Sequence, residues 1–318
     1  MENLKIAVLD SATLGNDIKL DLFNDLGEVE IYSTSTTDEV IERVKNIDVC
    51  IINKVKLTRD VLVHAKNLKL ICVAATGYDN IDTAYCKERG IAVCNVAGYS
   101  KNSVSQLTVA MVLSASVNLP AFRESVANGS YSKGKVQNIL TPVYHEISGL
   151  TWGIIGYGGI GRQVGSVAKA LGCKVVVNKR TPVDDEVCLP LDELLKVSDI
   201  ITVHVPLTDE TRNMIGEREV SLMKDGVILV NVARGAVFDE ESVTKGVESG
   251  KIGFLGCDVY SVEPMPENYP YSRIKALDNV CLTPHMAWGA YEARVRCMEE
   301  IYQNIKSFQN GDTRNRIV

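Results

Sequence analysis

Hydrophobic and polar positions along the chain form short apolar runs that alternate with longer segments of helical spacing. The runs fall into two series. The first comprises residues 5–9, 29–32, 48–53, 69–74 and 91–95, and the second comprises residues 152–156, 174–178, 199–205, 226–232, 253–259 and 280–283. Short strands that alternate with helices are typical of parallel sheets. The pattern therefore predicts an α/β protein with two doubly wound, Rossmann-like domains.

Two long segments with helical spacing connect these series. The first covers residues 103–118 and is followed by Pro120 and a less regular arm, residues 129–148. The second covers residues 291–308 and places its apolar side chains on one face; these are Val295, Met298, Ile301, Tyr302 and Ile305. Because this last helix could return to the first series, we predict a discontinuous domain, residues 1–100 and 287–318, around an inserted domain, residues 101–286. A substrate would bind in the cleft between them.

Composition narrows the classes of function. The 318 residues are 46% hydrophobic and carry a net charge of −6, which argues against nucleic acid or an acidic membrane as the main partner. We find no stretch of transmembrane length and no signal-peptide pattern at the N-terminus. The 9 cysteines are scattered without a C-x-x-C motif, as expected of reduced thiols in a cytoplasmic protein without a metal site.

The segment that begins at Leu150 carries the strongest local signal. Its apolar run leads into Gly156, Gly158 and Gly161, spaced G-x-G-x-x-G, and then into an amphipathic helix and a second β-rich run. The first glycine permits a tight turn, the second lets the backbone approach a pyrophosphate, and the third lets helix and strand pack closely. The phosphates would face the free N–H groups of the helix N-terminus. We expect a dinucleotide site in the inserted domain.

The end of the second run bears on which dinucleotide binds. NAD-preferring sites usually place Asp or Glu there for the ribose 2′-hydroxyl. This chain has instead Asn178, Lys179, Arg180 and Thr181. Two cations and a hydroxyl could hold a 2′-phosphate, so NADP(H) is favoured and NAD(H) remains possible. The alternative is a solvated basic turn whose field is weakened by Asp184 and Asp185.

Three later runs are each followed by a residue suited to ketone reduction: Arg234, Glu263 and His285. An arginine fork matches a carboxylate or carbonyl oxygen, and a histidine can donate a proton near neutral pH. A neighbouring glutamate would favour the imidazolium and orient it. Each residue alone also fits a structural role, as a surface ion pair, a loop residue or a helix-boundary residue. Together behind a dinucleotide motif they favour catalysis.

The chain resembles the D-isomer-specific 2-hydroxyacid dehydrogenase family over nearly its whole length. The segments that carry the resemblance are ATGYDNID (75–82), GYGGIG (156–161), HVPLTDETRNMI (204–215), NVARGAVFDE (231–240), DVYSVEP (258–264) and TPHMAW (283–288). Within the family, these motifs are most similar to those of the glycerate dehydrogenase, or hydroxypyruvate reductase, branch. The resemblance implies a flavodoxin-like substrate-binding domain, residues 1–100 and 287–318, and an NAD(P)-binding Rossmann domain, residues 101–286.

The resemblance also implies roles by position. Arg234, Glu263 and His285 would be catalytic. Backbone N–H groups of Ala75, Thr76 and Gly77 would hold the substrate carboxylate, with Trp288 close to the substrate; the alternatives are a plain tight turn and an interface filler. The residues expected to contact the cofactor, besides those of the basic turn, are Val104, Thr108, Gly156, Gly158, Gly159, Ile160, Gly161, His204, Val205, Pro206, Thr211, Val232, Ala233, Arg234, Asp258, His285 and Ala287. Asp258 would accept a hydrogen bond from the nicotinamide carboxamide, and His204 is expected to line the cofactor site and not to donate a proton.

The expected activity is NAD(P)H-dependent reduction of a small 2-keto acid, hydroxypyruvate or glyoxylate first, by a cytoplasmic homodimer. Relatives often carry in the arm an aromatic residue that covers the partner's active site; here Leu140 or a neighbour takes that position, which leaves the substrate's size open. Alternatives are another keto-acid reductase of D-lactate type, a formate or phosphite dehydrogenase of this fold, and a dinucleotide-sensing, corepressor-like protein. The last keeps the fold without turnover, and fold alone does not dictate function.

Overall fold

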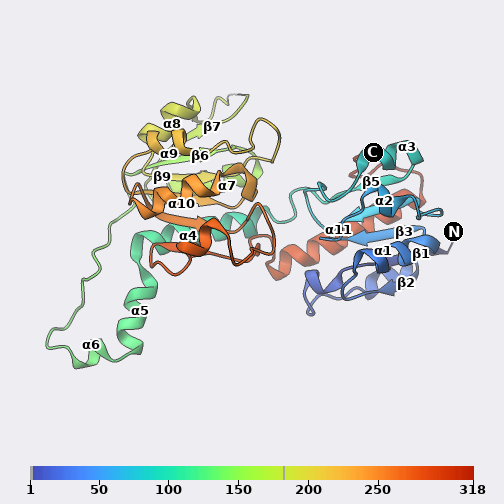
Figure 1. The fold of residues 1–318 in the computed structure, drawn as a ribbon, viewed down its shortest axis with the longest axis horizontal. Coiled ribbons are helices and arrows are strands. Elements are labelled where there is room, and N and C mark those ends of the chain that lie inside the picture. The colour runs from blue at the N-terminus through green and yellow to red at the C-terminus, as the bar shows by residue number, and fades with distance from the viewer. Residues whose placement is uncertain (1–2, 182) are drawn as a thin grey trace. The chain divides into compact units, whose positions relative to one another are not determined.

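A computed structural model describes residues 3–181 and 183–318, which form two compact units (Figure 1). One unit joins Met1–Ser100 to Gly289–Val318, and the other is Lys101–Trp288. Each consists of a parallel sheet with helices, as the alternation of apolar runs and helical segments predicted.

The first unit contains a five-stranded parallel sheet in the order β2-β1-β3-β4-β5. Its strands are β1 (Leu4–Val8), β2 (Gly27–Ile31), β3 (Val49–Ile52), β4 (Leu70–Val73) and β5 (Ala92–Cys94). Its helices are α1 (Thr37–Arg43), α2 (Arg59–Leu62), α3 (Thr83–Arg89) and α11 (Tyr291–Gln309). β3, β4 and β5 are buried at every position, which explains why they read as continuous apolar runs rather than alternating ones. The order 2-1-3-4-5 is flavodoxin-like.

The second unit contains a seven-stranded parallel sheet in the order β12-β11-β10-β9-β6-β7-β8. Its strands are β6 (Thr151–Ile155), β7 (Lys174–Asn178), β8 (Val187–Cys188), β9 (Ile200–Val203), β10 (Val227–Asn231), β11 (Ile252–Cys257) and β12 (Val280–Leu282). Its helices are α4 (Lys101–Val117), α5 (Leu119–Ala127), α6 (Ser130–Lys133), α7 (Gly159–Ala170), α8 (Leu191–Val197), α9 (Glu217–Leu222) and α10 (Glu240–Glu248). The strand order reverses between β6 and β9, where Rossmann folds bind dinucleotides.

The helix pattern was right for the terminal helix and incomplete after Pro120. Cys297, Met298, Ile301 and Ile305 of α11 are buried, so the apolar face seen in the sequence is a core face. At Asn118 the backbone is left-handed, with φ 51°, which ends α4, and α5 then begins with Pro120 in its first turn. Proline is tolerated there because its missing N–H would have no helical partner. The sequence pattern did not predict α5.

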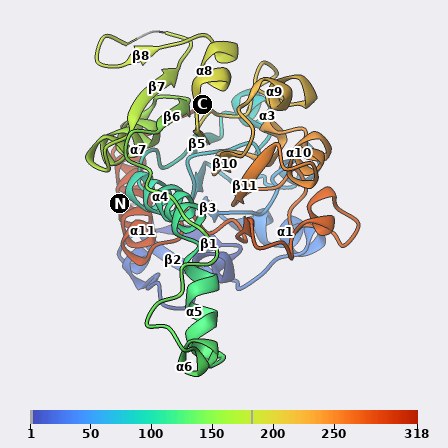
Figure 2. The same cartoon turned by 90° about the vertical axis from the view of Figure 1, so that its left-hand side faces the viewer.

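Helices α5 and α6 stand away from the sheet of their own unit, in both views of the ribbon (Figure 2). Neither helix has a buried residue. In the described part of the chain no single helix is long and apolar enough to cross a membrane, although the bent pair α4 and α5 passes the same test of length and composition.

Candidate active site

The glycine turn after β6 has the geometry that its sequence predicted. Gly156 has φ 92°, and a Cβ atom there would lie 2.7 Å from the backbone carbon of His204. A Cβ on Gly161 would lie 2.3 Å from the Gly156 carbonyl oxygen, so this glycine permits close packing of α7 on the strand. A Cβ on Gly158, which precedes α7, would meet nothing within 4 Å. No side chain caps that helix N-terminus.

The basic turn after β7 lies next to the glycine turn, because the Gly156 N–H donates to the Asn178 carbonyl at 2.9 Å. The Asn178 amide donates to the Leu189 carbonyl at 2.9 Å, so this side chain fixes the turn itself. Arg180 lies 3.7 Å from Glu210, and both side chains are exposed. Lys179 and Thr181 are exposed as well. Asp185 pairs with Arg162, which directs its charge toward that guanidinium.

On the other side of the glycine turn, His204 follows β9. Its Nε2 lies 3.1 Å from the Thr202 hydroxyl, which also accepts from the Trp152 indole at 3.1 Å. Burial lowers the pKa of His204 to about 3, so the imidazole is neutral at physiological pH. Nδ1 is buried and has no hydrogen-bond partner among the described residues. A neutral ring at this position fits a wall residue better than a proton donor.

The other predicted cofactor residues divide by exposure. Thr211 donates to the Pro206 carbonyl at 2.7 Å and accepts from the Thr208 N–H, so its hydroxyl shapes the loop after His204. Gly159, Ile160 and Val205 are partly or fully exposed beside the turn. The buried set comprises Val104, Thr108, Val232, Ala233 and Ala287. Thr108 is fully buried and its hydroxyl donates to the Val104 carbonyl, so its side chain packs in the core of this unit.

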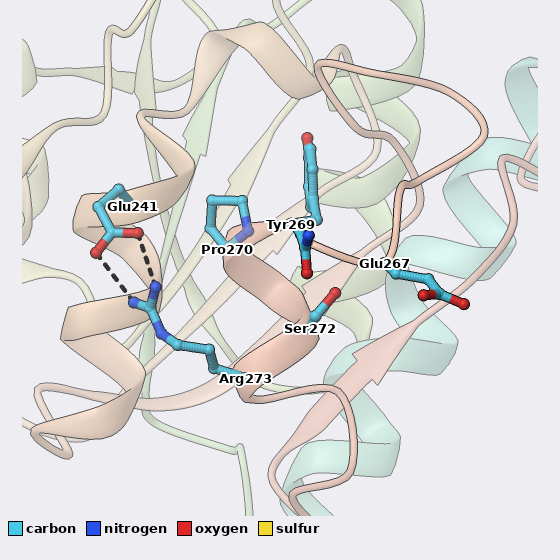
Figure 3. A pocket seen from close by; sticks show the side chains of 7 residues that line it. Glu241, Glu267, Tyr269, Pro270, Ser272 and Arg273 are labelled. Atoms are coloured by element: carbon cyan, nitrogen blue, oxygen red, sulfur yellow. Dashed lines mark hydrogen bonds and ion pairs between the residues drawn. The ribbon is translucent and has the colours of Figure 1, made fainter.

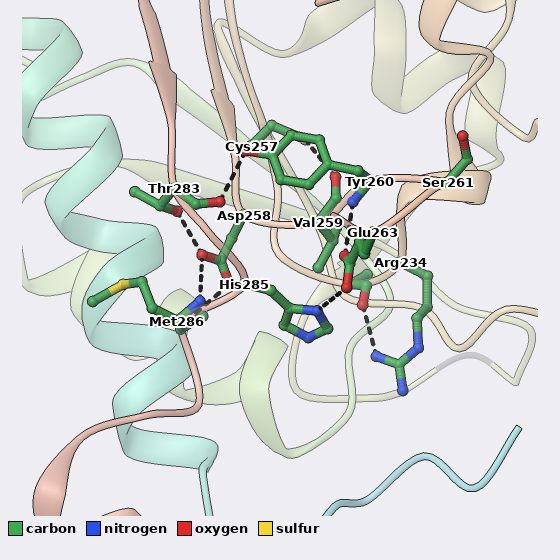
Figure 4. Close-up of polar contacts among 12 residues, drawn as sticks. Arg234, Cys257, Asp258, Val259, Tyr260, Ser261, Glu263, Thr283, His285 and Met286 are labelled. Atoms are coloured by element: carbon green, nitrogen blue, oxygen red, sulfur yellow. Dashed lines mark hydrogen bonds and ion pairs between the residues drawn. The ribbon is translucent and has the colours of Figure 1, made fainter. Parts of the chain in front are cut away.

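His285 and Glu263 contact each other directly. The distance from Nδ1 of the imidazole to Oε2 of the carboxylate is 2.6 Å, although the residues are 22 positions apart (Figure 4). The other carboxylate oxygen accepts from the Tyr260 N–H at 3.0 Å. Both side chains are only partly buried, with 24% and 32% of their surfaces exposed, so solvent or a ligand can reach Nε2. The imidazole is therefore oriented by one nitrogen and able to react through the other.

Arg234 follows β10 on the neighbouring turn. Its Nη1 donates to the Ala233 carbonyl at 2.8 Å, and the guanidinium is partly buried (Figure 4). The three residues predicted to be catalytic come from turns after β10, β11 and β12, which are consecutive in the sheet. The carboxyl ends of parallel strands meet at one edge, and this geometry explains how residues so far apart in sequence come together.

Asp258 is fully buried and holds the backbone around His285. One carboxylate oxygen accepts from the Thr283 hydroxyl at 2.5 Å and from the Met286 N–H at 2.9 Å, and the other accepts from the Ala287 N–H at 2.9 Å. Burial raises the pKa of Asp258 against the opposing effect of these donors. His285 itself has φ 53°, a conformation that non-glycine residues rarely adopt. The carboxylate thus clamps a strained turn, a role additional to the predicted contact with the carboxamide.

Comparison with known proteins decides the family. The model of the D-isomer specific 2-hydroxyacid dehydrogenase NAD-binding domain matches residues 109–287. A glycerate dehydrogenase of Methylorubrum extorquens is 36% identical over 98% of this chain and 98% of its own. The chain belongs to the D-isomer-specific 2-hydroxyacid dehydrogenase family. It is an oxidoreductase of that family, as the sequence motifs predicted.

Two further similarities bear on the chemistry of this dehydrogenase. A hydroxypyruvate reductase of Blautia hydrogenotrophica is 35% identical over 98% of this chain and 99% of its own. The structure of an acyclic imino acid reductase in complex with NADPH and D-Arg matches with a TM-score of 0.88 and 29% identity, over 99% of this chain and 100% of the other. The fold is therefore shared with an NADPH-bound enzyme, whereas the matching family model is described as NAD-binding.

The substrate residues expected in the other unit of the dehydrogenase lie directly after β4. The N–H groups of Ala75, Thr76 and Gly77 donate to no acceptor within residues 3–181 and 183–318. The loop is nevertheless held in place, because Val96 N–H donates to the Ala75 carbonyl and the Asn95 amide donates to the Thr76 carbonyl at 2.7 Å. Successive free N–H groups suit an anion. Trp288 is half-buried against the core of the second unit.

Two residues near the turns of Glu263 and His285 were not expected from the sequence. Tyr260 donates its hydroxyl to the Thr283 carbonyl at 2.9 Å and so links the turn of Glu263 to that of His285. Glu240 is a buried carboxylate next to the same turn. Glu240 lies in the motif NVARGAVFDE and Tyr260 lies in the motif DVYSVEP, but a motif does not show which side chains are in contact.

A surface pocket of about 410 Å³ lies elsewhere in this unit (Figure 3). Its lining comprises Glu241, Glu267, Asn268, Tyr269, Pro270, Ser272 and Arg273. Arg273 is paired with Glu241 and Glu248 there. None of the predicted catalytic or cofactor residues lines this pocket, so it is separate from the candidate active site.

Proposed function

We propose that this dehydrogenase reduces hydroxypyruvate to D-glycerate, or glyoxylate to glycolate, with a nicotinamide cofactor. The observation that carries the proposal is the 2.6 Å contact between His285 Nδ1 and Glu263, beside Arg234 at the carboxyl edge of a Rossmann sheet. The glycerate dehydrogenase and hydroxypyruvate reductase relatives, each similar over almost the whole chain, support the choice of substrate.

The residues of the chain perform the following steps in this proposal. The free N–H groups of residues 75–77 bind the substrate carboxylate, and Arg234 binds and polarises the keto oxygen. Glu263 holds Nδ1 of His285, so that Nε2 carries the proton and donates it to the same oxygen. The bound cofactor supplies the hydride for the keto carbon. In the oxidative direction Nε2 takes the proton back.

Several features fit a dinucleotide. The uncapped N-terminus of α7, the open space at Gly158 and the buried, unpartnered Nδ1 of His204 all surround the switch point of the sheet. We propose that NADP(H) is preferred, because Lys179 and Arg180 follow β7 where NAD-preferring sites place an acid. Arg180 lies 3.7 Å from the exposed carboxylate of Glu210, and this negative charge weakens the attraction of Arg180 for a 2′-phosphate. Lys179 is therefore the stronger determinant of the two.

We also propose that the protein is a homodimer. Helix α5 and the arm, residues 129–148, expose large apolar side chains: Leu119, Val126, Tyr131, Val136, Leu140, Val143 and Tyr144. Large apolar side chains exposed along one segment are typical of an interaction site, and two-fold dimers are the commonest homo-oligomers. The cytoplasmic location expected from the sequence stays a prediction.

The test is loss of nicotinamide absorbance with hydroxypyruvate and with glyoxylate, run in parallel with NADPH and NADH. Faster oxidation of NADPH than of NADH supports both the reductase and the phosphate-binding role of the basic turn. Oxidation of NADH alone keeps the reductase and makes the basic turn ordinary surface. Dinucleotide binding without turnover across a broad panel of 2-keto acids contradicts the proposal and favours a sensor of this fold.

A further inference from the structure

The buried carboxylate of Glu240 lies behind the turn that carries Glu263, and it has no role in the chemistry described above. We propose that Glu240 is a positioning residue, which fixes this turn so that Glu263 can hold the catalytic imidazole. The inference rests on the proposed function, because it assigns Glu240 to the same reaction.

The environment of Glu240 is built around a carboxylate. The residue is the first of α10 and is only 7% exposed. One of its oxygens accepts from the Ser261 N–H at 3.1 Å, and the other accepts from the Ser261 hydroxyl at 2.6 Å and from the Tyr269 hydroxyl. Within the described residues no Lys or Arg forms an ion pair with it, so these donors compensate its burial.

Both donors from Ser261 belong to the turn of Glu263. Ser261 follows Tyr260, whose N–H donates to Oε1 of Glu263 at 3.0 Å and leaves Oε2 for His285. The Tyr260 hydroxyl donates to the Thr283 carbonyl at 2.9 Å, and the His285 N–H donates to the same carbonyl at 3.0 Å. The hydrogen bonds thus form a closed ring through both catalytic turns, and Glu240 supports that ring at Ser261.

The same turn also packs against the residue that follows Arg234. A Cβ atom on Gly235 would lie 1.9 Å from the backbone carbon of Tyr260 and 2.2 Å from the Ser261 nitrogen. The backbone at residues 260 and 261 therefore packs closely on Gly235 and is hydrogen-bonded to Glu240. A shift of this backbone would change the position of Glu263 relative to both His285 and Arg234. Misplacement by about 1 Å can reduce catalysis about 100-fold.

The variant Glu240→Gln distinguishes a positioning role of Glu240 from a role in packing alone. The amide has nearly the same volume, but only its oxygen accepts, so its NH₂ group faces a donor. We expect kcat with hydroxypyruvate to fall about 10- to 100-fold. The dissociation constant for the dinucleotide should stay unchanged, and the solvent isotope effect on kcat should rise because proton transfer becomes slower. A purely structural role would lower the melting temperature without changing the isotope effect.

Glu241→Gln is the matched control. Glu241 is the next residue of α10, and its partner is the exposed side chain of Arg273 (Figure 3). This variant should retain kcat and the isotope effect of the parent enzyme. Should Glu240→Gln fail to fold, Ser261→Ala and Tyr269→Phe each remove one donor to Glu240 and should lower kcat by smaller factors, of about 2- to 10-fold.

A readout that needs no substrate keeps this inference separate from the proposed activity. The low-field proton resonance of an imidazole N–H bonded to a carboxylate can be recorded on the free protein and assigned by its loss in Glu263→Gln. We expect Glu240→Gln to broaden or abolish it and Glu241→Gln to retain it. An intact resonance and a parental kcat in Glu240→Gln overturn the positioning role. A parent protein without turnover overturns the proposed function, and the resonance then still decides the role of Glu240.

Discussion

The turns of Glu263 and His285 and the arm after α4 are built in opposite ways. In the catalytic turns, the buried carboxylates of Asp258 and Glu240 accept hydrogen bonds from backbone and hydroxyl groups of neighbouring segments. In α5 and the arm that follows it, neither α5 nor α6 has a buried residue, and large apolar side chains are exposed. Both regions belong to the same unit of the chain.

The difference indicates that the catalytic turns have all their partners within one chain, whereas the arm leaves apolar side chains for another surface to cover. Buried polar groups whose hydrogen bonds are all formed keep the surrounding backbone in one conformation. Removal of one partner disturbs that conformation and the function that depends on it. Exposed apolar side chains gain free energy only when something covers them. We therefore expect substitutions in the catalytic turns to reduce turnover, and substitutions in the arm to change association.

The largest effect is expected at the reacting groups. His285→Ala removes the proton donor and Arg234→Ala removes the cation that polarises the substrate, so each should lower kcat by about 100- to 10,000-fold. The measurement is NADPH oxidation with hydroxypyruvate, with circular dichroism to show that the fold survives. His64→Ala, at an exposed position of the other unit, is the control and should keep parental activity. Near-normal turnover of either catalytic variant would contradict the assignment.

In the arm, Leu140→Asp combined with Val143→Asp should weaken the dimer. Each change replaces an exposed apolar side chain by a charge, and burial of such a side chain contributes about 1.5 kcal/mol or more. The dissociation constant should therefore rise at least about 100-fold, as measured by light scattering over a concentration series. Val63→Asp, on the first unit, should leave association unchanged. A parent protein that is monomeric at micromolar concentration would refute the dimer.

The basic turn tests the cofactor preference. Lys179→Asp should lower kcat/KM for NADPH about 10- to 100-fold, because a charge-assisted hydrogen bond of about 1.5 to 3 kcal/mol is lost and a like charge is added. The value for NADH should change little. Lys174→Asp, at the exposed start of the same strand, serves as the control. Equal losses with both dinucleotides would show that the turn does not recognise the 2′-phosphate.

The smallest effect is expected at His204, whose Nδ1 lacks a partner in an otherwise well-bonded region. Its pKa in the folded protein is lowered to about 3 by burial, below the ordinary value of about 6.5. Between these values the unfolded chain binds a proton that the folded protein does not, so the free energy of unfolding decreases as the pH falls.

Compared with His204→Gln, the parent protein should therefore lose about 2 kcal/mol more of its unfolding free energy between pH 6.5 and 4.5. Urea denaturation at several pH values measures this difference. The exposed variant His64→Gln should follow the parent curve. A difference between parent and His204→Gln that does not depend on pH would contradict the buried, neutral state of this ring.

Much of the architecture was predictable because it depends on local periodicity. The apolar runs gave strand positions within a few residues, and the glycine spacing predicted a turn that needs φ 92° at Gly156. The helix α5 was missed because Pro120 suggested an end, whereas the left-handed Asn118 makes the break and the proline begins a new helix. Proline does not by itself distinguish the end of one helix from the start of the next.

The sequence by itself determined the α/β class, the family and the residue types available for catalysis, because these follow from periodicity and from motifs of short range. Only the tertiary structure decided which groups meet. Glu263 and His285 are 22 positions apart, and Tyr269 reaches Glu240 across 29 positions. Such contacts depend on the order in which strands pair and on how their turns pack at one sheet edge, and no local pattern encodes that geometry.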